Sequence, residues 1–192
     1  MIAIIKYNGG NVSSVQNALN RLDAESIITD DLELIKNTDK VIFPGVGEAS
    51  STMKILKEKG LDLLIPTLKQ PVLGICLGMQ LMCKNNEEGN TVGMGIFDIN
   101  VKKFPSENII PHMGWNTISD LKSTIYSGIK EESDVYFVHS FYCELSENTT
   151  SVCDYILPFS ASLQKDNFYA MQFHPEKSGK IGSQLLQNFL KL

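Results

Sequence analysis

The chain has 192 residues, of which 43% are hydrophobic and 20% charged, a usual balance for a globular protein with a full core. Its net charge of −5 and its lack of a basic cluster argue against a nucleic-acid partner. No apolar run approaches the roughly 20 residues of a membrane span, no secretion signal opens the chain, and the four cysteines form no C-x-x-C pair. These features predict one reduced, cytoplasmic domain over residues 1–192.

Strand-like and helix-like segments alternate in the first half of the chain. The predicted strands, which are short and largely apolar, are Ile2–Tyr7, Ser26–Ile28, Lys40–Phe43 and Val72–Ile75. A turn is expected at Asn8–Asn11, and apolar residues with helical spacing follow the first three strands. This alternation is typical of βαβ units and predicts an α/β fold with a mostly parallel central sheet flanked by helices.

The rhythm changes from about Val92, where connections shorten and helical patterns become rare. The strands predicted in this half are Ile96–Phe104, Trp115–Ile118, Val135–Cys143, Val152–Leu157 and Phe168–Phe173. A final helix carries Ile181, Leu185 and Phe189 on one face. We expect antiparallel strand additions that fold onto the same sheet.

A cysteine lies between two glycines where the fourth predicted strand meets a helical segment. Gly74-x-Cys76-x-Gly78 is the Gly-x-nucleophile-x-Gly pattern of a strand–turn–helix elbow, with sulfur in place of a serine oxygen. Glycine suits both positions because the tight turn leaves no room for a Cβ, and a helix N-terminus at the turn favours the thiolate of Cys76. The alternative interpretation is a buried structural cysteine beside a glycine-rich turn.

A histidine and a glutamate follow the last predicted strand, at the sheet edge where parallel-sheet enzymes build their sites. Pro175 favours an extended conformation for His174, and residues two apart in extended chain point the same way. We therefore expect Glu176 to orient His174, which would act as the base of a Cys–His–Glu triad. The alternative is a surface histidine followed by an N-terminal helix signal.

Together the two motifs resemble those of the class I glutamine amidotransferases. The matching segments are Gly74-x-Cys76-x-Gly78-x-Gln80 and Gln172-Phe173-His174-Pro175-Glu176. The resemblance implies a flavodoxin-like fold and hydrolysis of glutamine to glutamate and ammonia through a thioester on Cys76. The three histidines show no metal-ligand spacing, so we expect neither a metal nor a cofactor.

The same resemblance assigns groups around the thiol, because Pro44–Gly47 falls where the family has its oxyanion strand. The backbone N–H groups implied for the oxyanion hole are those of Val46, Gly47 and Leu77. The residues implied for glutamine binding are Gly45, Gln80, Ser140 and Phe141. Taken alone, Pro44–Gly47 would be a plain turn and the segment at 139–142 a plain strand.

A third segment indicates which glutaminases the chain resembles. Pro111-His112-Met113-Gly114-Trp115-Asn116 is similar to a segment of the glutaminase subunits of imidazole glycerol phosphate synthases. This implies a heterodimer in histidine biosynthesis, in which a (β/α)₈-barrel cyclase uses the ammonia to make imidazole glycerol phosphate and AICAR. The implied partner contacts are Met113, Trp115, Asn116 and Lys177. Otherwise Trp115 would be a core residue and Lys177 a solvated one.

Three alternatives stay open at this point. Departures from the family pattern, such as Glu48-Ala49 after the oxyanion strand, allow a paralogue that supplies ammonia to an amidino-sugar synthase for surface glycans. A Cys-dependent hydrolase of similar fold would use the same elbow. A non-catalytic binding subunit is expected to lack Cys76, His174 or Glu176, and all three are present.

Overall fold

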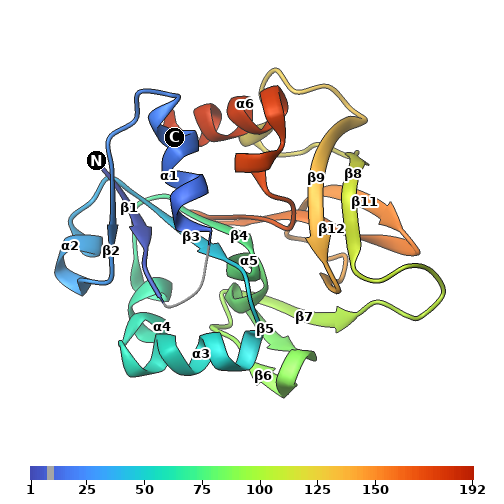
Figure 1. Ribbon diagram of the computed structural model, residues 1–192, viewed down its shortest axis with the longest axis horizontal. Helices are drawn as coiled ribbons and strands as arrows, with labels where there is room; N and C mark the ends of the chain where they lie inside the picture. Colours follow the sequence, from blue (N-terminus) through green and yellow to red (C-terminus); the bar gives the residue numbers. More distant parts are fainter. Residues whose placement is uncertain (8–10) are drawn as a thin grey trace.

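A seven-stranded sheet forms the centre of the computed structural model, which describes residues 1–7 and 11–192 (Figure 1). Its strands in chain order are β1 (Ile2–Ile5), β2 (Ser26–Thr29), β3 (Lys40–Gly45), β4 (Val72–Cys76), β11 (Thr149–Tyr155), β12 (Leu157–Lys165) and β13 (Phe168–Met171). Their order across the sheet is β11-β12-β13-β4-β3-β1-β2. The five strands from β13 to β2 are parallel, whereas β11 and β12 are antiparallel additions. The predicted fold class is confirmed.

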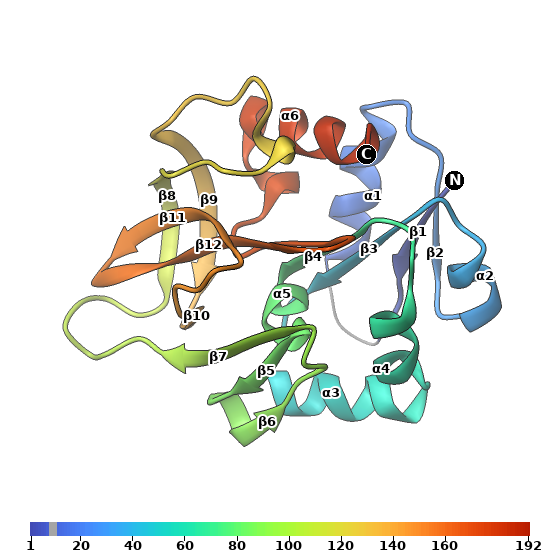
Figure 2. The same ribbon diagram turned by 180° about the vertical axis from the view of Figure 1, so that it is seen from behind.

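Helices cover both faces of this sheet. They are α1 (Val12–Asn20), α2 (Leu32–Lys36), α3 (Ala49–Glu58), α4 (Leu61–Leu64), α5 (Leu77–Met82) and α6 (Gly179–Leu190). Single 3₁₀ turns are η1 (Ile65–Thr67), η2 (Glu88–Asn90), η3 (Thr124–Tyr126) and η4 (Pro175–Lys177). Helices α1 and α6 lie on one face, and α3, α4 and α5 lie on the other (Figures 1 and 2).

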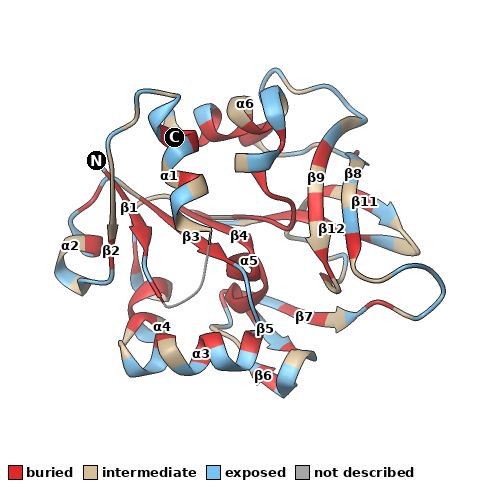
Figure 3. Ribbon diagram, viewed as in Figure 1, coloured by how far each residue is buried: buried red, intermediate tan, exposed pale blue. Residues whose placement is uncertain are grey.

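The sheet is buried on both faces because alternate residues of its strands pack into two different clusters. Ile4 and Ile42 pack with Leu185 of α6, whereas Ile5 and Phe43 join the cluster on the α3 side. Figure 3 shows buried residues running along the central strands. The continuous apolar runs of the first half therefore reflect burial on two sides.

Two smaller sheets lie beside the large one. One has the order β10-β7-β5-β6, and the other pairs β8 with β9 in antiparallel register. Their strands are β5 (Cys83–Asn86), β6 (Thr91–Val92), β7 (Phe97–Lys103), β8 (His112–Ile118), β9 (Ser133–His139) and β10 (Phe141–Cys143). The expectation that all later strands join the main sheet is thus wrong, since only β11, β12 and β13 do so.

The predicted strand Val135–Cys143 is in fact two strands that separate at Ser140. The first part pairs with β8 and the second with β7. The side chain of His139 donates from Nδ1 to the carbonyl oxygen of Phe141 at 2.7 Å, and this contact bridges the break. Residues 139–141 at this bend line the same cavity as Cys76 of the elbow.

Other differences are local. The predicted strand Val152–Leu157 corresponds to β11, whereas β5, β6 and β12, which begins at Leu157, were not predicted. Residues 8–10 of the predicted turn lie outside the described residues. None of the helices formed by residues 1–7 and 11–192 has the length and apolar character needed to cross a bilayer.

Candidate active site

Cys76 occupies a tight elbow between β4 and α5. Its backbone has φ 53° and ψ −110°, a strained conformation for a residue with a side chain. A Cβ on Gly74 would lie 2.5 Å from Sδ of Met82, and one on Gly78 would lie 2.0 Å from the carbonyl oxygen of Phe43. The two glycines are therefore needed so that the turn can pack against its neighbours.

The oxyanion-strand segment runs directly beside this elbow. Gly45 pairs with Cys76 in the parallel β3–β4 ladder, and a Cβ on Gly45 would lie 2.5 Å from the backbone nitrogen of Gly78. The chain continues through Val46 and then Gly47, whose φ of +114° favours glycine. This close approach brings the backbone of Val46 and Gly47 to the same cavity as Leu77.

Tyr7 supports this segment, although no sequence motif pointed to it. Its buried hydroxyl donates a hydrogen bond to the carbonyl oxygen of Pro44 at 2.7 Å. Burial raises the pKa of Tyr7, and a negative charge on Cys76 raises it further. A hydrogen bond with the backbone N–H of Val46 lowers the pKa but does not outweigh these two effects. The hydroxyl therefore keeps the proton that it donates to Pro44.

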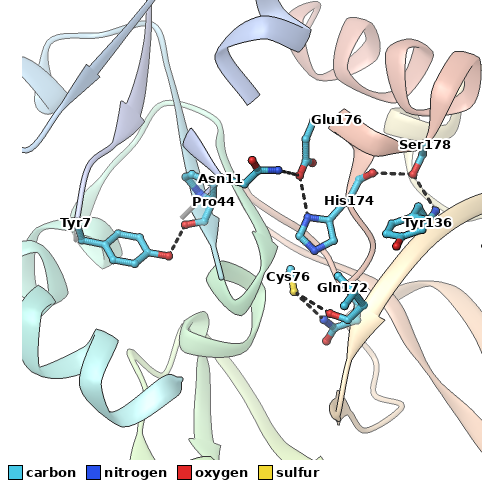
Figure 4. A network of polar contacts seen from close by, with 10 residues as sticks. Tyr7, Asn11, Pro44, Cys76, Tyr136, Gln172, His174, Glu176 and Ser178 are labelled. Carbon is cyan, nitrogen blue, oxygen red and sulfur yellow. Dashed lines mark hydrogen bonds and ion pairs between the residues drawn. The ribbon is translucent and has the colours of Figure 1, made fainter. Parts of the chain in front are cut away.

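His174 and Glu176 form a buried pair next to the thiol. Nδ1 of His174 lies 2.8 Å from Oε1 of Glu176, and each side chain is only 1% exposed. His174 is extended, with φ −99° and ψ 96°, as expected before proline. Asn11 donates to the same carboxylate oxygen at 3.1 Å. Nε2 of His174 has no hydrogen-bond partner in the described structure, and the ring points toward Cys76 (Figure 4).

The surroundings of His174 favour its charged form. Burial lowers its pKa, but the interactions with Cys76 and Glu176 outweigh burial and raise the pKa to about 10. A protonated imidazole beside a cysteine favours the thiolate, which is the reactive form of the side chain. Glu176 thus stabilises an imidazolium that can later give up its proton.

One buried amide side chain contacts the sulfur, and a second amide supports the first. Sγ of Cys76 lies 3.8 Å from the carbonyl oxygen of Val138, and Nε2 of Gln172 donates to Sγ at 3.7 Å. Gln80 donates from Nε2 to Oε1 of Gln172 at 2.9 Å and to the Phe141 carbonyl at 3.1 Å. Although Gln80 lines the cavity, its amide nitrogen is already used within the protein.

A cavity of about 280 Å³ opens above the thiol. The predicted residues that line it are Val46, Gly47, Cys76, Leu77, Gln80, Ser140, Phe141 and His174. Gly45 and Glu176 are not among its lining residues. The remaining lining residues are Glu88, Pro111, Val138 and His139. None of them was predicted as a site residue, although Pro111 and His139 belong to the matched segments at 111–116 and 139–142.

Glu88 supplies an acidic group to the cavity wall. It belongs to the 3₁₀ turn η2, and Oε2 accepts a hydrogen bond from the backbone N–H of Ala49 at 2.8 Å. Burial raises the pKa of Glu88, while the Ala49 N–H lowers it. The carboxylate is therefore fixed between α3 and the cavity. It was missed because only the tertiary fold brings η2 to this place.

The predicted partner contacts lie on or near β8 and divide between its two faces. Met113 and Trp115 are 62% and 58% exposed. Asn116 lies on the opposite face, where it donates to Nε2 of His112 at 3.2 Å and to the carbonyl oxygen of Asp154 at 3.1 Å. Trp115 packs edge-on to Tyr136, and Nζ of Lys177 lies 6.0 Å from the same Tyr136 ring.

Over residues 1–7 and 11–192, no group of three or more His, Cys, Asp or Glu side chains is placed to hold an ion. The chemistry that these residues can perform is nucleophilic attack by sulfur, proton transfer through one imidazole, and stabilisation of a negative oxygen by backbone N–H groups.

Comparison with known proteins gives a consistent result. The model of the glutamine amidotransferase class-I family matches residues 4–192. The imidazole glycerol phosphate synthase subunit HisH of Bacteroides fragilis (strain YCH46) is 59% identical over 194 residues, covering 100% of this chain and 99% of the relative. The subunit HisH 2 of Methanococcus maripaludis is 44% identical over 200 residues, covering 100% of this chain and 99% of the relative.

Solved structures show the same fold at low sequence identity. A crystal structure of a glutamine amidotransferase has a TM-score of 0.75 and 17% identity, covering 100% of this chain and 98% of that chain. The structure of PurLQS from Thermotoga maritima has a TM-score of 0.73 and 15% identity, with coverage of 99% and 97%.

Proposed function

Because the chain belongs to the class I glutamine amidotransferase family, we propose that it is the glutaminase subunit of an imidazole glycerol phosphate synthase. The observation that carries this proposal is the cavity in which the Cys76 thiol meets the buried His174–Glu176 pair. The high identity to HisH subunits over the whole chain supports the choice of synthase. Residues 1–192 then act as one amidotransferase domain, and the enzyme works in the cytoplasm.

Glutamine enters the cavity with its side-chain amide at the elbow. The carboxamide carbon meets Sγ of Cys76, and the carbonyl oxygen faces the N–H groups of Val46, Gly47 and Leu77. Glu88 gives the cavity wall a carboxylate, which suits the α-ammonium group at the other end of the substrate. The backbone of Ser140 and Phe141 lines the remaining wall.

The first half-reaction makes a thioester and ammonia. The thiolate of Cys76 attacks the carboxamide carbon, and the carbonyl electron pair moves to the oxygen held by the backbone N–H groups. Nε2 of His174 donates its proton to the leaving nitrogen when the carbon–nitrogen bond breaks. Glu176 keeps Nδ1 protonated throughout and fixes the ring by its 2.8 Å contact.

The second half-reaction restores the thiol. Nε2 of His174, now neutral, accepts a proton from water as the water oxygen attacks the thioester carbon. The second oxyanion is held by the same N–H groups, and its collapse breaks the carbon–sulfur bond to release glutamate. The sulfur leaves as the thiolate beside the reprotonated imidazole.

The ammonia passes to a synthase partner that docks on the exposed surface carrying Met113, Trp115 and Lys177. We assign this partner as a (β/α)₈-barrel cyclase, in a heterodimer, because the similar HisH proteins are named as subunits of imidazole glycerol phosphate synthase. Ammonia released into neutral water would become ammonium, a poor nucleophile. Docking lets the acceptor receive it unprotonated.

The direct test is a Cys76→Ala variant assayed with the cyclase. We expect glutamine hydrolysis and glutamine-dependent synthesis to be lost, whereas ammonium salts should still support synthesis. Cys153→Ala is the matched control, because burial raises the pKa of that thiol to about 12 and removes it from the reactive form. The control should hydrolyse glutamine at the rate of the unmodified protein.

Other results would change the assignment. If Cys76→Ala kept most of its glutaminase rate, the thioester mechanism would be wrong. Normal hydrolysis of glutamine without synthesis by any histidine-pathway cyclase would favour the amidino-sugar paralogue. Faster cleavage of peptides than of glutamine would favour a Cys-dependent hydrolase.

A further inference from the structure

Two buried histidines that take no part in the proposed chemistry lie in direct contact near the cavity. His112 and His139 are register partners in the β8–β9 ladder. Nδ1 of His112 lies 2.9 Å from Nε2 of His139, and both residues are buried. Each nitrogen in a buried pair of polar rings needs a hydrogen-bond partner, because an unpaired buried polar atom destabilises the fold.

The surrounding contacts fix which nitrogen of each ring carries the proton. The Phe141 carbonyl can only accept, so Nδ1 of His139 donates to it at 2.7 Å. In the neutral ring, Nε2 of His139 is then an acceptor and receives Nδ1–H of His112. Nε2 of His112 in turn accepts from Nδ2 of Asn116 at 3.2 Å. Every ring nitrogen is thus satisfied by one arrangement of protons.

The pair is neutral at physiological pH. Burial lowers the pKa of His112 to about 4. Burial also lowers the pKa of His139 to about 3, although the hydrogen bond to the Phe141 carbonyl opposes this shift. Aromatic rings enclose them. His112 stacks between Phe137 and Tyr155, at centroid distances of 4.7 and 4.0 Å. Charging either ring would put two donors face to face in an apolar cage.

The hydrogen bonds continue from this pair to the sulfur. The Phe141 carbonyl that accepts from His139 also accepts from Nε2 of Gln80 at 3.1 Å. Gln80 donates to Gln172 at 2.9 Å, and Gln172 donates to Sγ of Cys76 at 3.7 Å. Figure 4 shows the last of these contacts beside His174. The Phe141 carbonyl therefore anchors both the histidine pair and the amides at the thiol.

We propose that His112 and His139 are positioning residues for glutamine hydrolysis. As a neutral relay they hold the Phe141 carbonyl, which orients Gln80 and Gln172 so that an amide N–H of Gln172 faces the sulfur. An N–H group aimed at sulfur favours the thiolate. Ser140 and Phe141 also line the cavity, so the same relay fixes part of the glutamine-binding wall. This inference rests on the proposed role of Cys76 as nucleophile.

Two substitutions at one position separate the relay from simple packing. His112→Phe keeps an aromatic ring between Phe137 and Tyr155 but removes the donor to His139. His112→Asn loses the ring but places an amide nitrogen near the position of Nδ1. The relay predicts that His112→Phe lowers kcat/KM for glutamine about tenfold, as expected for one buried acceptor left unpaired. It also predicts that His112→Asn retains more activity than His112→Phe, whereas a packing role predicts the reverse order.

The matched control is Tyr155→Phe, which keeps the stack on His112 and removes only the hydroxyl contact to Ile109. Its glutaminase rate should equal that of the unmodified protein. The rate of Cys76 alkylation by iodoacetamide at pH 7, followed by mass spectrometry, should fall in His112→Phe and be unchanged in Tyr155→Phe. This second readout reports on the sulfur without glutamine.

The tautomers give a test that needs no variant. Long-range proton–nitrogen NMR of the unmodified protein at pH 7 should find both rings neutral and protonated at Nδ1. Rings protonated at Nε2, or equal activity of His112→Phe and the unmodified protein, would overturn the relay. If the unmodified protein hydrolysed no glutamine, the proposed function would fail, and the tautomers and alkylation rates would still decide the relay.

Discussion

The imidazole of His174 lies between a carboxylate on one nitrogen and a thiol on the other. Glu176 is two residues away in the chain, and the extended backbone at His174 brings the two side chains together at 2.8 Å. With both side chains 1% exposed, water does not screen their interaction. The ring is held in one orientation and in its charged form.

A Glu176→Gln variant tests this arrangement at the level of one side chain. The amide can still accept from His174 and Asn11, but it carries no negative charge to stabilise the imidazolium. We expect a lower glutaminase rate that stays above that of Cys76→Ala, because the nucleophile and base remain. Complete loss of activity that a divalent metal restored would point to a metal site in place of an orienting acid.

The His174–Glu176 pair also predicts that the stability of the protein depends on pH. The pKa of His174 is raised from its ordinary 6.5 to about 10, so the folded state binds a proton that the unfolded state releases. The stabilisation that protonated His174 gives the folded state is fully present below about pH 6.5 and is lost as the pH rises toward 10. The free energy of unfolding in urea should therefore fall across this range, and fall less steeply in Glu176→Gln. Identical slopes for the two proteins would contradict the charged pair.

The residues that sequence could identify are those with a local pattern. Cys76, between its glycines, and His174-Pro175-Glu176 each lie in one short segment, and the structure places their side chains together. Glu88 and Tyr7 have no such pattern, because tertiary contacts alone bring them to the cavity and to Pro44. The period of two along β8 could have shown that Asn116 faces away from Trp115.

At the level of elements, the elbow depends on how closely β3 approaches α5. Gly45 pairs with Cys76 at the end of the β3–β4 ladder, and Gly78 lies against the carbonyl of Phe43. Both contacts are between main-chain atoms, which cannot move aside as a side chain can. The same approach brings Val46 and Gly47 to the cavity, so the packing of the elbow and the position of the oxyanion strand are linked.

A Gly78→Ala variant should therefore affect stability and activity together. Its Cβ would lie 2.0 Å from the Phe43 carbonyl oxygen, and the forced shift should lower the free energy of unfolding by about 2 kcal/mol or more. Glutaminase activity should fall as the oxyanion strand moves. Gly128→Ala is the control, since nothing lies within 4 Å of its added methyl and only its φ of +77° is unfavourable. Gly128→Ala should lower the free energy of unfolding by about 1 kcal/mol and leave the glutaminase activity unchanged. Equal effects of the two variants on stability and activity would contradict the steric argument.

The elements of the first half were predictable because their strands are apolar on both faces and alternate with helical patterns. Strands β5 and β6 escaped prediction because Lys84 and Asn85 are exposed and polar. Tertiary pairing defines them, since β5 pairs with β7 and β6 pairs with β5. The break at Ser140 depends on a side-chain contact between His139 and Phe141, which spacing does not reveal. That break is also where the cavity wall forms.

At the scale of the whole molecule, the candidate docking surface connects to His174, the proposed catalytic base, through one residue. The backbone N–H of His174 donates to the carbonyl oxygen of Tyr136 at 2.9 Å, and the Tyr136 ring packs against Trp115. Ser178 links the same two segments, since it accepts from Tyr136 N–H at 2.9 Å and donates to the His174 carbonyl at 2.7 Å. A partner seated on Trp115 would therefore press on the segment that positions His174.

Replacement of Trp115 by alanine tests whether hydrolysis depends on docking. The exposed indole is the largest apolar group on this surface, and loss of such an anchor weakens association by about 2 kcal/mol when it is a hot spot. We expect a higher dissociation constant for the cyclase and a smaller stimulation of hydrolysis by the cyclase with its nucleotide substrate. Leu63→Ala is the control, because Leu63 is 76% exposed on α4, across the sheet from β8.

The measurement compares glutaminase rates with and without the cyclase for the unmodified protein and both variants. The unmodified protein and Leu63→Ala should be stimulated equally, while Trp115→Ala should need a higher cyclase concentration for the same rate. If adding the cyclase changed none of the rates, hydrolysis would not depend on docking. If no barrel synthase bound the unmodified protein, the ammonia would have a different acceptor. The surface around Trp115 would then bind a partner of another kind.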